Sequence, residues 1–188
     1  MRKLAFFFSL LLLLMVMSCE KEYSYEGGNI RTPTDTVHVP VIINDFPVCQ
    51  ACIINTTTEL SRWSFESGNS KLCGEADTAI INPDRNAFTF FGPSSCSRDT
   101  GMVITVYLDT EMLNRDRTNL MVKGAFYYYD RITPSYIFMS LSVNSFSVTI
   151  NSYSHQTRIA TGTFQGSVFR SNGTPASITA GKFKVKLI

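Results

Sequence analysis

A strict alternation of apolar and polar residues constrains this chain more than any other feature. In residues 145–151, Phe146, Val148 and Ile150 alternate with serine, threonine and asparagine, and in residues 182–187 an apolar residue follows each of three lysines. Successive side chains of a β-strand point to opposite faces, so this period of two predicts strands with one buried face and one wet face. Such strands are typical of antiparallel sheets.

Further short stretches with strand-like composition lie between turn residues, at 62–66, 78–81, 87–91, 101–108, 120–129, 136–142 and 159–169. The one helical signal is short and covers residues 110–114. The sequence therefore predicts an all-β fold, an antiparallel β-sandwich or barrel of about 8–10 strands with at most one short helix.

Glycines give more detailed expectations for the last two strands. Asn172-Gly173 predicts a type I′ turn in the final hairpin, because both central positions of that turn need positive φ. Gly162 and Gly166 lie on the apolar face of residues 159–169, where two glycines suggest a bend or a bulge in that strand.

Composition excludes several classes of protein. The 188 residues include 17 Lys plus Arg and 15 Asp plus Glu, and 44% of them are hydrophobic. That balance is neither the low hydrophobicity of a disordered chain nor the strong positive charge of a nucleic-acid-binding protein, so we expect no nucleic-acid partner. The length suits one domain with a substantial core.

The amino-terminal segment has the layout of a secretion signal. Arg2 and Lys3 precede an apolar run over residues 4–17, which is too short to span a bilayer comfortably. The run ends in Val-Met-Ser-Cys, which resembles the lipobox of bacterial lipoproteins. This resemblance implies that the signal is cut before Cys19, that the Cys19 thiol carries a lipid, and that the protein is held at a membrane.

We accordingly divide the chain into a signal peptide (1–18), a lipidated cysteine with a flexible tether (19–44) and a single β domain (45–188). The polar, acidic stretch CEKEY resembles the export signals of surface lipoproteins of Bacteroidota. This implies an outer-membrane lipoprotein exposed at the cell surface, and a position facing the periplasm stays open.

Three passages, GTFQGSVF, SNGTPASITAGKFKV and FTFFGPSSCSRDTGMVITVYL, resemble those of uncharacterised β-rich envelope lipoproteins of Bacteroidota. The resemblance covers about the carboxy-terminal two thirds of the chain. It implies an all-β fold and a lipoprotein, and it brings no established activity.

Beyond Cys19 there are four cysteines, Cys49, Cys52, Cys73 and Cys96. An even number in an exported chain favours disulfides. We favour Cys49 with Cys52 and Cys73 with Cys96, because the latter two flank neighbouring predicted strands, and crossed pairings stay open. A zinc ribbon needs two CxxC knuckles, and a thioredoxin-like centre needs a helix after CxxC, where this chain has poor helix formers. We therefore expect structural disulfides, no metal and no cofactor.

The strongest signal for binding is the run Phe126-Tyr127-Tyr128-Tyr129, which places aromatics on both faces of one strand. Exposed aromatic rings stack on sugars, so Tyr127 and Tyr129 are candidate ligand-binding residues, although tyrosines also occur simply as good strand formers. Trp63 is expected to be a core residue.

No GxSxG, HExxH or P-loop motif occurs, and the acids Glu75, Asp77 and Asp84 stand alone in predicted loops. The sequence thus favours a membrane-anchored, non-enzymatic β domain that binds a glycan or an envelope protein. The alternative is an envelope enzyme, either a thiol oxidoreductase using Cys49 and Cys52 or a hydrolase using acids such as Asp77.

Overall fold

A computed structural model describes residues 46, 48–54, 59–108, 113–133 and 135–188. The predicted signal peptide 1–18, Cys19 and the predicted tether 19–44 lie outside the described residues. Most of the predicted helix 110–114 does as well, and its last two residues belong to a bend.

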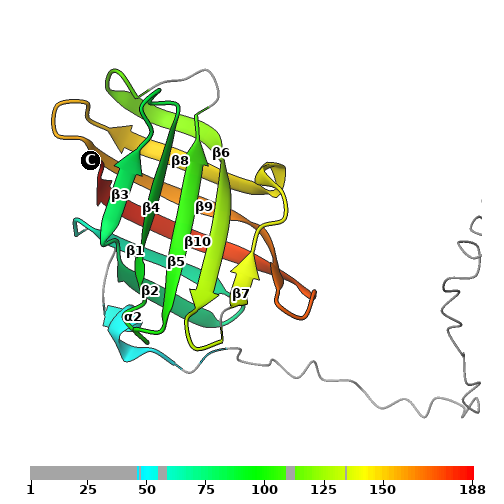
Figure 1. Ribbon diagram of the computed structural model, residues 1–188. Coiled ribbons are helices and arrows are strands. Elements are labelled where there is room, and N and C mark those ends of the chain that lie inside the picture. Colours follow the sequence, from blue (N-terminus) through cyan, green and yellow to red (C-terminus); the bar gives the residue numbers. More distant parts are fainter. Residues whose placement is uncertain (1–45, 47, 55–58, 109–112, 134) are drawn as a thin grey trace, which may run out of the picture. The chain divides into compact units, whose positions relative to one another are not determined.

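All strand pairs of the described structure are antiparallel, and the all-β prediction is confirmed (Figure 1). Within the described residues, the helical elements are the short helix α2 (Gln50–Ile54) and the 3-10 turn η2 (Val143–Ser145). The strands are β1 (Arg62–Ser67), β2 (Ser70–Glu75), β3 (Thr78–Ile81), β4 (Ala87–Pro93), β5 (Thr100–Tyr107), β6 (Arg117–Asp130), β7 (Ser135–Met139), β8 (Phe146–Tyr153), β9 (Ile159–Arg170) and β10 (Pro175–Lys186).

The strands form a meander that closes into a small barrel. Strands that are consecutive in the chain pair with one another along most of its length, and β10 returns to pair with β1. The seam is completed by hydrogen bonds from Ile81 N–H to Ile188 C=O (3.2 Å) and from Ile188 N–H to Ala79 C=O (2.8 Å), and by a bridge between Gly74 and Ser94. Closure removes most of the free sheet edge on which another chain could pair.

Strand β6 belongs to both halves of the barrel. Its residues 117–123 pair with β8, and its residues 123–130 pair with β5, while 127–130 also pair with the extra strand β7. Figure 1 shows the layer of β3, β4, β5 and β6 crossing over the layer of β1, β8, β9 and β10. The core lies between these layers.

Aromatic rings fill the space between the layers. Phe164, for example, is 2% exposed, and its ring lies against those of Phe65, Phe126, Phe146 and Phe183, with centroids 6.0–6.5 Å apart. Small barrels are filled by side chains in this way. The largest fully buried residues are Trp63, Phe65, Phe88, Phe90, Met102, Ile104, Phe126, Tyr128, Phe138, Phe146, Phe164 and Phe183, which confirms Trp63 as a core residue.

The glycines of β9 have a role other than the one predicted. The register shifts beside β9 lie in its neighbours, in β10 between Ile178 and Gly181, where Ala180 has a φ of 51°, and in β8 between Ile150 and Ser152, opposite Gly162. Gly162 instead makes room for a ring, because a Cβ there would come within 2.6 Å of the Phe183 side chain. Gly166 in the same way makes room for Phe146. The prediction of a bulge in β9 itself was wrong, because the extra residues belong to the two neighbouring strands and the inward glycines admit large neighbours; a bend of β9 stays a prediction.

Asn172-Gly173 lies in the β9–β10 turn as predicted, but the turn type differs. Gly173 has a φ of 80°, whereas Asn172 is not among the residues with positive φ. Gly173 N–H donates to Arg170 C=O (2.8 Å), and Arg170 N–H donates to Thr174 C=O (2.9 Å). This pattern is typical of a three-residue loop with one glycine in the left-handed region. The Asn172 side chain accepts a hydrogen bond from Thr174 N–H, which favours this conformation over type I′.

Candidate functional site

The aromatic run of β6 does place rings on both faces of the sheet. Phe126 and Tyr128 are buried, at 2% and 1% exposure, while Tyr127 and Tyr129 point outward and are half-buried. Strand β7 extends both sets, because Phe138 pairs with Tyr128 and Tyr136 pairs with Tyr129. The sequence therefore placed Tyr127 and Tyr129 on the correct face, and ligand binding by them stays a prediction.

Tyr127 belongs to a continuous row of apolar side chains across the outer face. Phe91 of β4 pairs with Val103 of β5, Val103 pairs with Tyr127, and Tyr127 pairs with Met139 of β7. Directly opposite residues have side chains within contact distance. We call these four residues the outer row. Its exposed end is Phe91, with 37% exposure.

Tyr129 and Tyr136 extend the outer row at the end of the strands. The rings of Tyr127 and Tyr136 lie 6.2 Å apart, tilted by 49°. Tyr129 lies over Gly101, a position where a Cβ would collide with the tyrosine ring, and the Arg131 guanidinium stands 5.6 Å from the Tyr129 ring centroid. We call Tyr127, Tyr129 and Tyr136 the tyrosine patch.

Polar groups from the β6–β7 turn border the tyrosine patch. The Asp130 carboxylate accepts hydrogen bonds from the Thr133 hydroxyl (2.8 Å) and from Ile132 N–H (2.9 Å). These hydrogen bonds lower the pKa of the Asp130 carboxyl below its usual value of 3.8, the larger effect coming from Thr133. The Arg131 cation therefore lies at the rim of the patch, while the Asp130 carboxylate is held by groups of its own turn.

Tyr128 lies on the opposite side of the same strand and is a structural residue. Its hydroxyl donates to the Thr100 hydroxyl (3.1 Å), and burial raises the pKa of the Tyr128 hydroxyl above 10.0. Its ring packs edge-on against Trp63 and Phe65. Tyr128 thus anchors the strand that presents Tyr127 and Tyr129.

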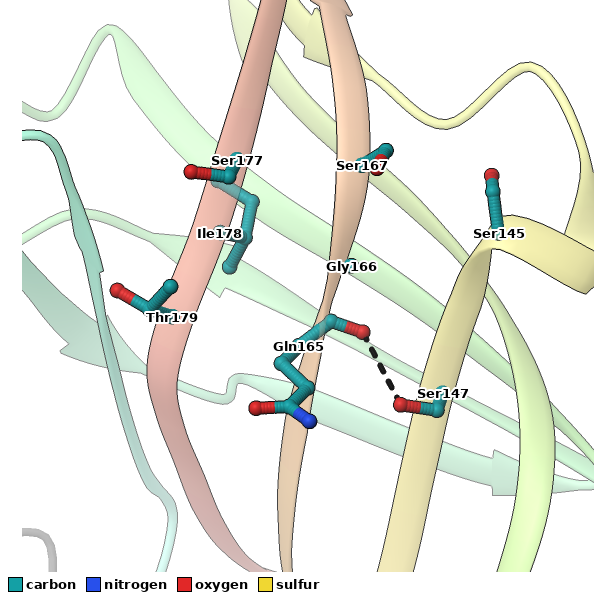
Figure 2. A pocket seen from close by; sticks show the side chains of 8 residues that line it. All are labelled: Ser145, Ser147, Gln165, Gly166, Ser167, Ser177, Ile178 and Thr179. Atoms are coloured by element: carbon teal, nitrogen blue, oxygen red, sulfur yellow. Dashed lines mark hydrogen bonds between the residues drawn. The ribbon is translucent and has the colours of Figure 1, made fainter.

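A second surface feature lies on the outer face of β8, β9 and β10. It is a shallow hollow of about 320 Å³ lined mainly by short polar side chains. Figure 2 shows these side chains and the hydrogen bond that the Ser147 hydroxyl donates to Gln165 C=O (3.3 Å). Its lining residues are Ser145, Ser147, Gln165, Gly166, Ser167, Ser177, Ile178 and Thr179. This lining offers hydrogen bonds but no ring for stacking, so the tyrosine patch is the better candidate for binding.

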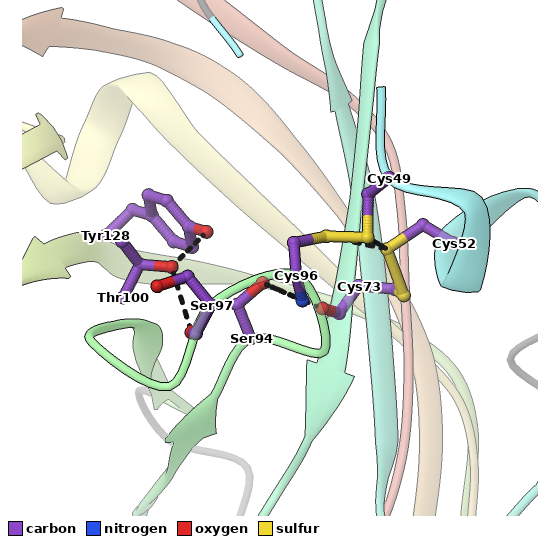
Figure 3. The surroundings of a disulfide bond; sticks show 8 residues. All are labelled: Cys49, Cys52, Cys73, Ser94, Cys96, Ser97, Thr100 and Tyr128. Atoms are coloured by element: carbon purple, nitrogen blue, oxygen red, sulfur yellow. Dashed lines mark hydrogen bonds between the residues drawn. A yellow bond between two sulfur atoms is a disulfide. The ribbon is translucent and has the colours of Figure 1, made fainter. Parts of the chain in front are cut away.

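The four cysteines form two disulfides, and the pairing that we favoured from the sequence is wrong. The bonds join Cys49 to Cys96 and Cys52 to Cys73, with Cα atoms 5.6 Å and 5.3 Å apart (Figure 3). Those spacings lie in the usual range for disulfides. The crossed pairing fastens α2 to β2 and to the loop after β4, which sequence spacing alone does not determine.

Helix α2 explains how two near neighbours reach different partners. Cys52 N–H donates to Cys49 C=O (3.0 Å), so the chain turns helically within CxxC although the sequence predicted poor helix formation. Cys73 and the segment before Cys96 are in turn held together, because Ser95 N–H donates to Cys73 C=O (2.9 Å). The sulfurs of Cys49, Cys52 and Cys96 lie within 4.8 Å of one another, but in disulfides they offer no thiolate to a metal.

The remaining sequence candidates are not assembled into a site. Glu75 forms an ion pair with Arg62 (2.9 Å), while Asp77 and Asp84 are exposed. His155, which belongs to no catalytic or metal motif of the sequence, is exposed beside Arg85, with 3.4 Å between the guanidinium and Nδ1. These side chains lie apart on the surface and do not form a catalytic group.

Sequence reasoning missed Phe91, Val103 and Met139 as neighbours of Tyr127. Phe91 and Val103 fall on the outward positions of predicted strands, so their apolar character was a usable signal. Their alignment with Tyr127 depends on the register between neighbouring strands, which the sequence of each strand does not determine.

Comparison with protein-family models, curated proteins and solved structures finds no match for this chain. Among the described residues, the helices are too short to cross a membrane.

Proposed function

We propose that the protein is a lipid-anchored lipoprotein of the cell envelope whose β domain binds a glycan through the tyrosine patch and catalyses no reaction. The anchor rests on the sequence around Cys19, which has the apolar run and the Ser-Cys junction of a lipobox. Several acyl chains hold a protein at a membrane more firmly than one chain does.

The observation that carries the binding proposal is the grouping of three outward tyrosines beside charged and hydroxyl groups. The faces of aromatic rings are electron-rich and attract the C–H groups on the face of a sugar ring. The Arg131 guanidinium and the tyrosine hydroxyls can exchange hydrogen bonds with sugar hydroxyls. Apolar surface combined with a few oriented polar groups is the usual composition of a binding site.

The lowered pKa of the Asp130 carboxyl argues against a role of this residue as a general acid. Two hydrogen bonds from its own turn stabilise the ionised carboxylate and lower its pKa. General acid catalysis needs a group that still holds its proton near the working pH. Asp130 is therefore unsuited to protonate a ligand.

The test is a glycan array probed with the full-length protein, followed by titration of the best ligand. We expect Tyr127→Ala to weaken binding at least tenfold, because the ring at the centre of the patch is removed; a tenfold loss corresponds to about 1.4 kcal/mol. Gln165→Ala, on the hydroxyl-lined hollow, is the matched control and should bind like the wild type.

Two results would overturn the glycan proposal. One is the absence of binding to every glycan on the array, and the other is unchanged affinity in Tyr127→Ala. Capture of a purified envelope protein that depends on Phe91 and Tyr127, without glycan binding, would reassign the outer row to protein recognition.

Anchoring is tested separately by Cys19→Ser. We expect the variant to lose acylation and to leave the membrane fraction. Retention of an unmodified mature protein in the membrane would contradict the lipoprotein proposal without affecting the binding proposal.

A further inference from the structure

The two disulfides touch each other. The Cys52 sulfur lies 3.4 Å from the Cys49 sulfur and 3.3 Å from the Cys96 sulfur (Figure 3). Cys52 therefore contacts both atoms of the other disulfide while it is itself bonded to Cys73. A thiolate formed at Cys49 would have a disulfide sulfur within van der Waals contact, which is the arrangement that exchange requires.

Access to the cluster is graded from outside to inside. Cys96 is exposed and Cys49 is half-buried, whereas Cys52 and Cys73 are 0% and 4% exposed. A thiol from solution therefore reaches the Cys49–Cys96 bond first, and the Cys52–Cys73 bond is shielded from direct attack. Access is one of the factors that decide which disulfide reacts.

We propose that this four-sulfur cluster is a thiol–disulfide exchange site, in which an external thiol at Cys96 moves the buried bond from Cys52–Cys73 to Cys49–Cys52. In the first step, the external thiolate attacks the Cys96 sulfur, a mixed disulfide forms, and Cys49 leaves as a thiolate. In the second step, Cys49 attacks the Cys52 sulfur and Cys73 leaves as a thiolate.

The third step returns the external thiol. The Cys73 thiolate attacks the Cys96 sulfur of the mixed disulfide, a Cys73–Cys96 bond forms, and the external thiolate is released. Every step breaks one S–S bond and forms another, so no oxidant or reductant is consumed. The product is a second pairing, Cys49–Cys52 with Cys73–Cys96.

The surroundings of the cluster favour the release of Cys49 and the formation of the Cys73–Cys96 bond. A hollow of about 110 Å³ borders Cys49 between Phe46, Val48 and Ile53, and it leaves space for the released side chain to turn. The backbones of Cys73 and Cys96 are bridged by Ser94, whose hydroxyl donates to Cys73 C=O (3.2 Å) and accepts from Cys96 N–H (3.1 Å). The sulfurs of Cys49, Cys52 and Cys96 lie within 4.8 Å of one another and the Cys73 sulfur lies outside this group, so the Cys73 side chain must turn toward Cys96 in the third step. The exchange thus needs movement of side chains and of the loop, while the strands stay paired.

The experiment uses the full-length, fully oxidised protein with reduced glutathione as the external thiol. Samples are quenched in acid, alkylated and mapped as non-reduced peptides by mass spectrometry. We expect a glutathione adduct on Cys96 first, followed by peptides that carry the Cys49–Cys52 and Cys73–Cys96 bonds. Cleavage of Cys52–Cys73 before any adduct on Cys96, or an adduct without a Cys49–Cys52 bond, would overturn the proposal.

Two double variants test whether the outer disulfide passes the exchange on to the buried disulfide. Cys49→Ser with Cys96→Ser retains only the buried bond, and we expect glutathione to open Cys52–Cys73 at least tenfold more slowly than in the wild type. Equal rates would show that the outer pair plays no part. Cys52→Ser with Cys73→Ser is the matched control, which should form the Cys96 adduct at the wild-type rate. The order of events in the wild type decides the question even where a variant fails to fold.

Discussion

Replacing Phe164 by alanine tests whether the ring network between the two layers holds the barrel together. Phe164 is 2% exposed and contacts the rings of Phe65, Phe126, Phe146 and Phe183. Loss of the buried ring removes a transfer free energy of about 2 kcal/mol. If about 100 Å³ stays empty, a cavity cost of about 24 cal/mol per Å³ adds a further 2 kcal/mol or so. We therefore expect Phe164→Ala to lower the free energy of unfolding by about 4 kcal/mol.

The assay is urea unfolding of the full-length protein, followed by far-ultraviolet circular dichroism and by fluorescence. Phe91→Ala is the matched control, because the same ring is removed from the 37% exposed end of the outer row, and it should cost about 1 kcal/mol. Benzene should stabilise Phe164→Ala and leave the wild type unchanged, since apolar cavities of this kind stay dry and bind benzene. A loss below about 1.5 kcal/mol without a benzene effect would refute the idea that the rings pack as a rigid network.

Three further predictions concern pH and packing. Stability should fall as the pH rises above 10.0, because the unfolded chain ionises Tyr128 before the folded one does, and Tyr128→Phe should weaken this alkaline loss in pH-dependent urea melts. In an NMR titration, the midpoint of the Asp130 carboxyl should lie below 3.8, and a midpoint above 3.8 would contradict this prediction. The β6–β7 turn should therefore keep the hydrogen bonds to Asp130 at neutral pH and lose them only as the pH falls through the lowered pKa. Gly162→Ala should cost about 3 kcal/mol, because the new methyl group would collide with the Thr149 carbonyl oxygen as well as with the Phe183 ring, whereas Ser167→Ala on the outer face of the same strand should change stability little.

Period-two alternation predicted the strands well where one face is buried and the other wet. Residues 146–151 and 182–186 fall in β8 and β10, respectively, with the predicted apolar residues inward. Strand β2 was missed, because Leu72, Cys73 and Gly74 are consecutive buried residues and leave no alternation. Leu72 packs in the core, and Cys73 on the opposite face is covered by α2 through its bond to Cys52, which is a long-range effect.

The candidate site was only partly predictable for a related reason. The outward direction of Tyr127 and Tyr129 follows from strand periodicity alone. Their neighbours depend on the register of β4, β5 and β7, which sequence does not display. The disulfide pairing likewise depends on where α2 docks, and spacing along the chain favours the nearest cysteine rather than the nearest in space.

The position of Trp63 gives this protein a built-in optical reporter. It is the chain's single tryptophan, it is 0% exposed, and its indole N–H donates to Glu75 C=O (3.0 Å). A Cβ on Gly74, the residue after Cys73, would collide with the indole ring, so the fluorophore lies against the strand that carries the buried disulfide. Disulfides quench indole emission at short range. Opening of the cysteine cluster in the folded protein should therefore brighten the emission without shifting its wavelength, whereas unfolding should shift it to the red.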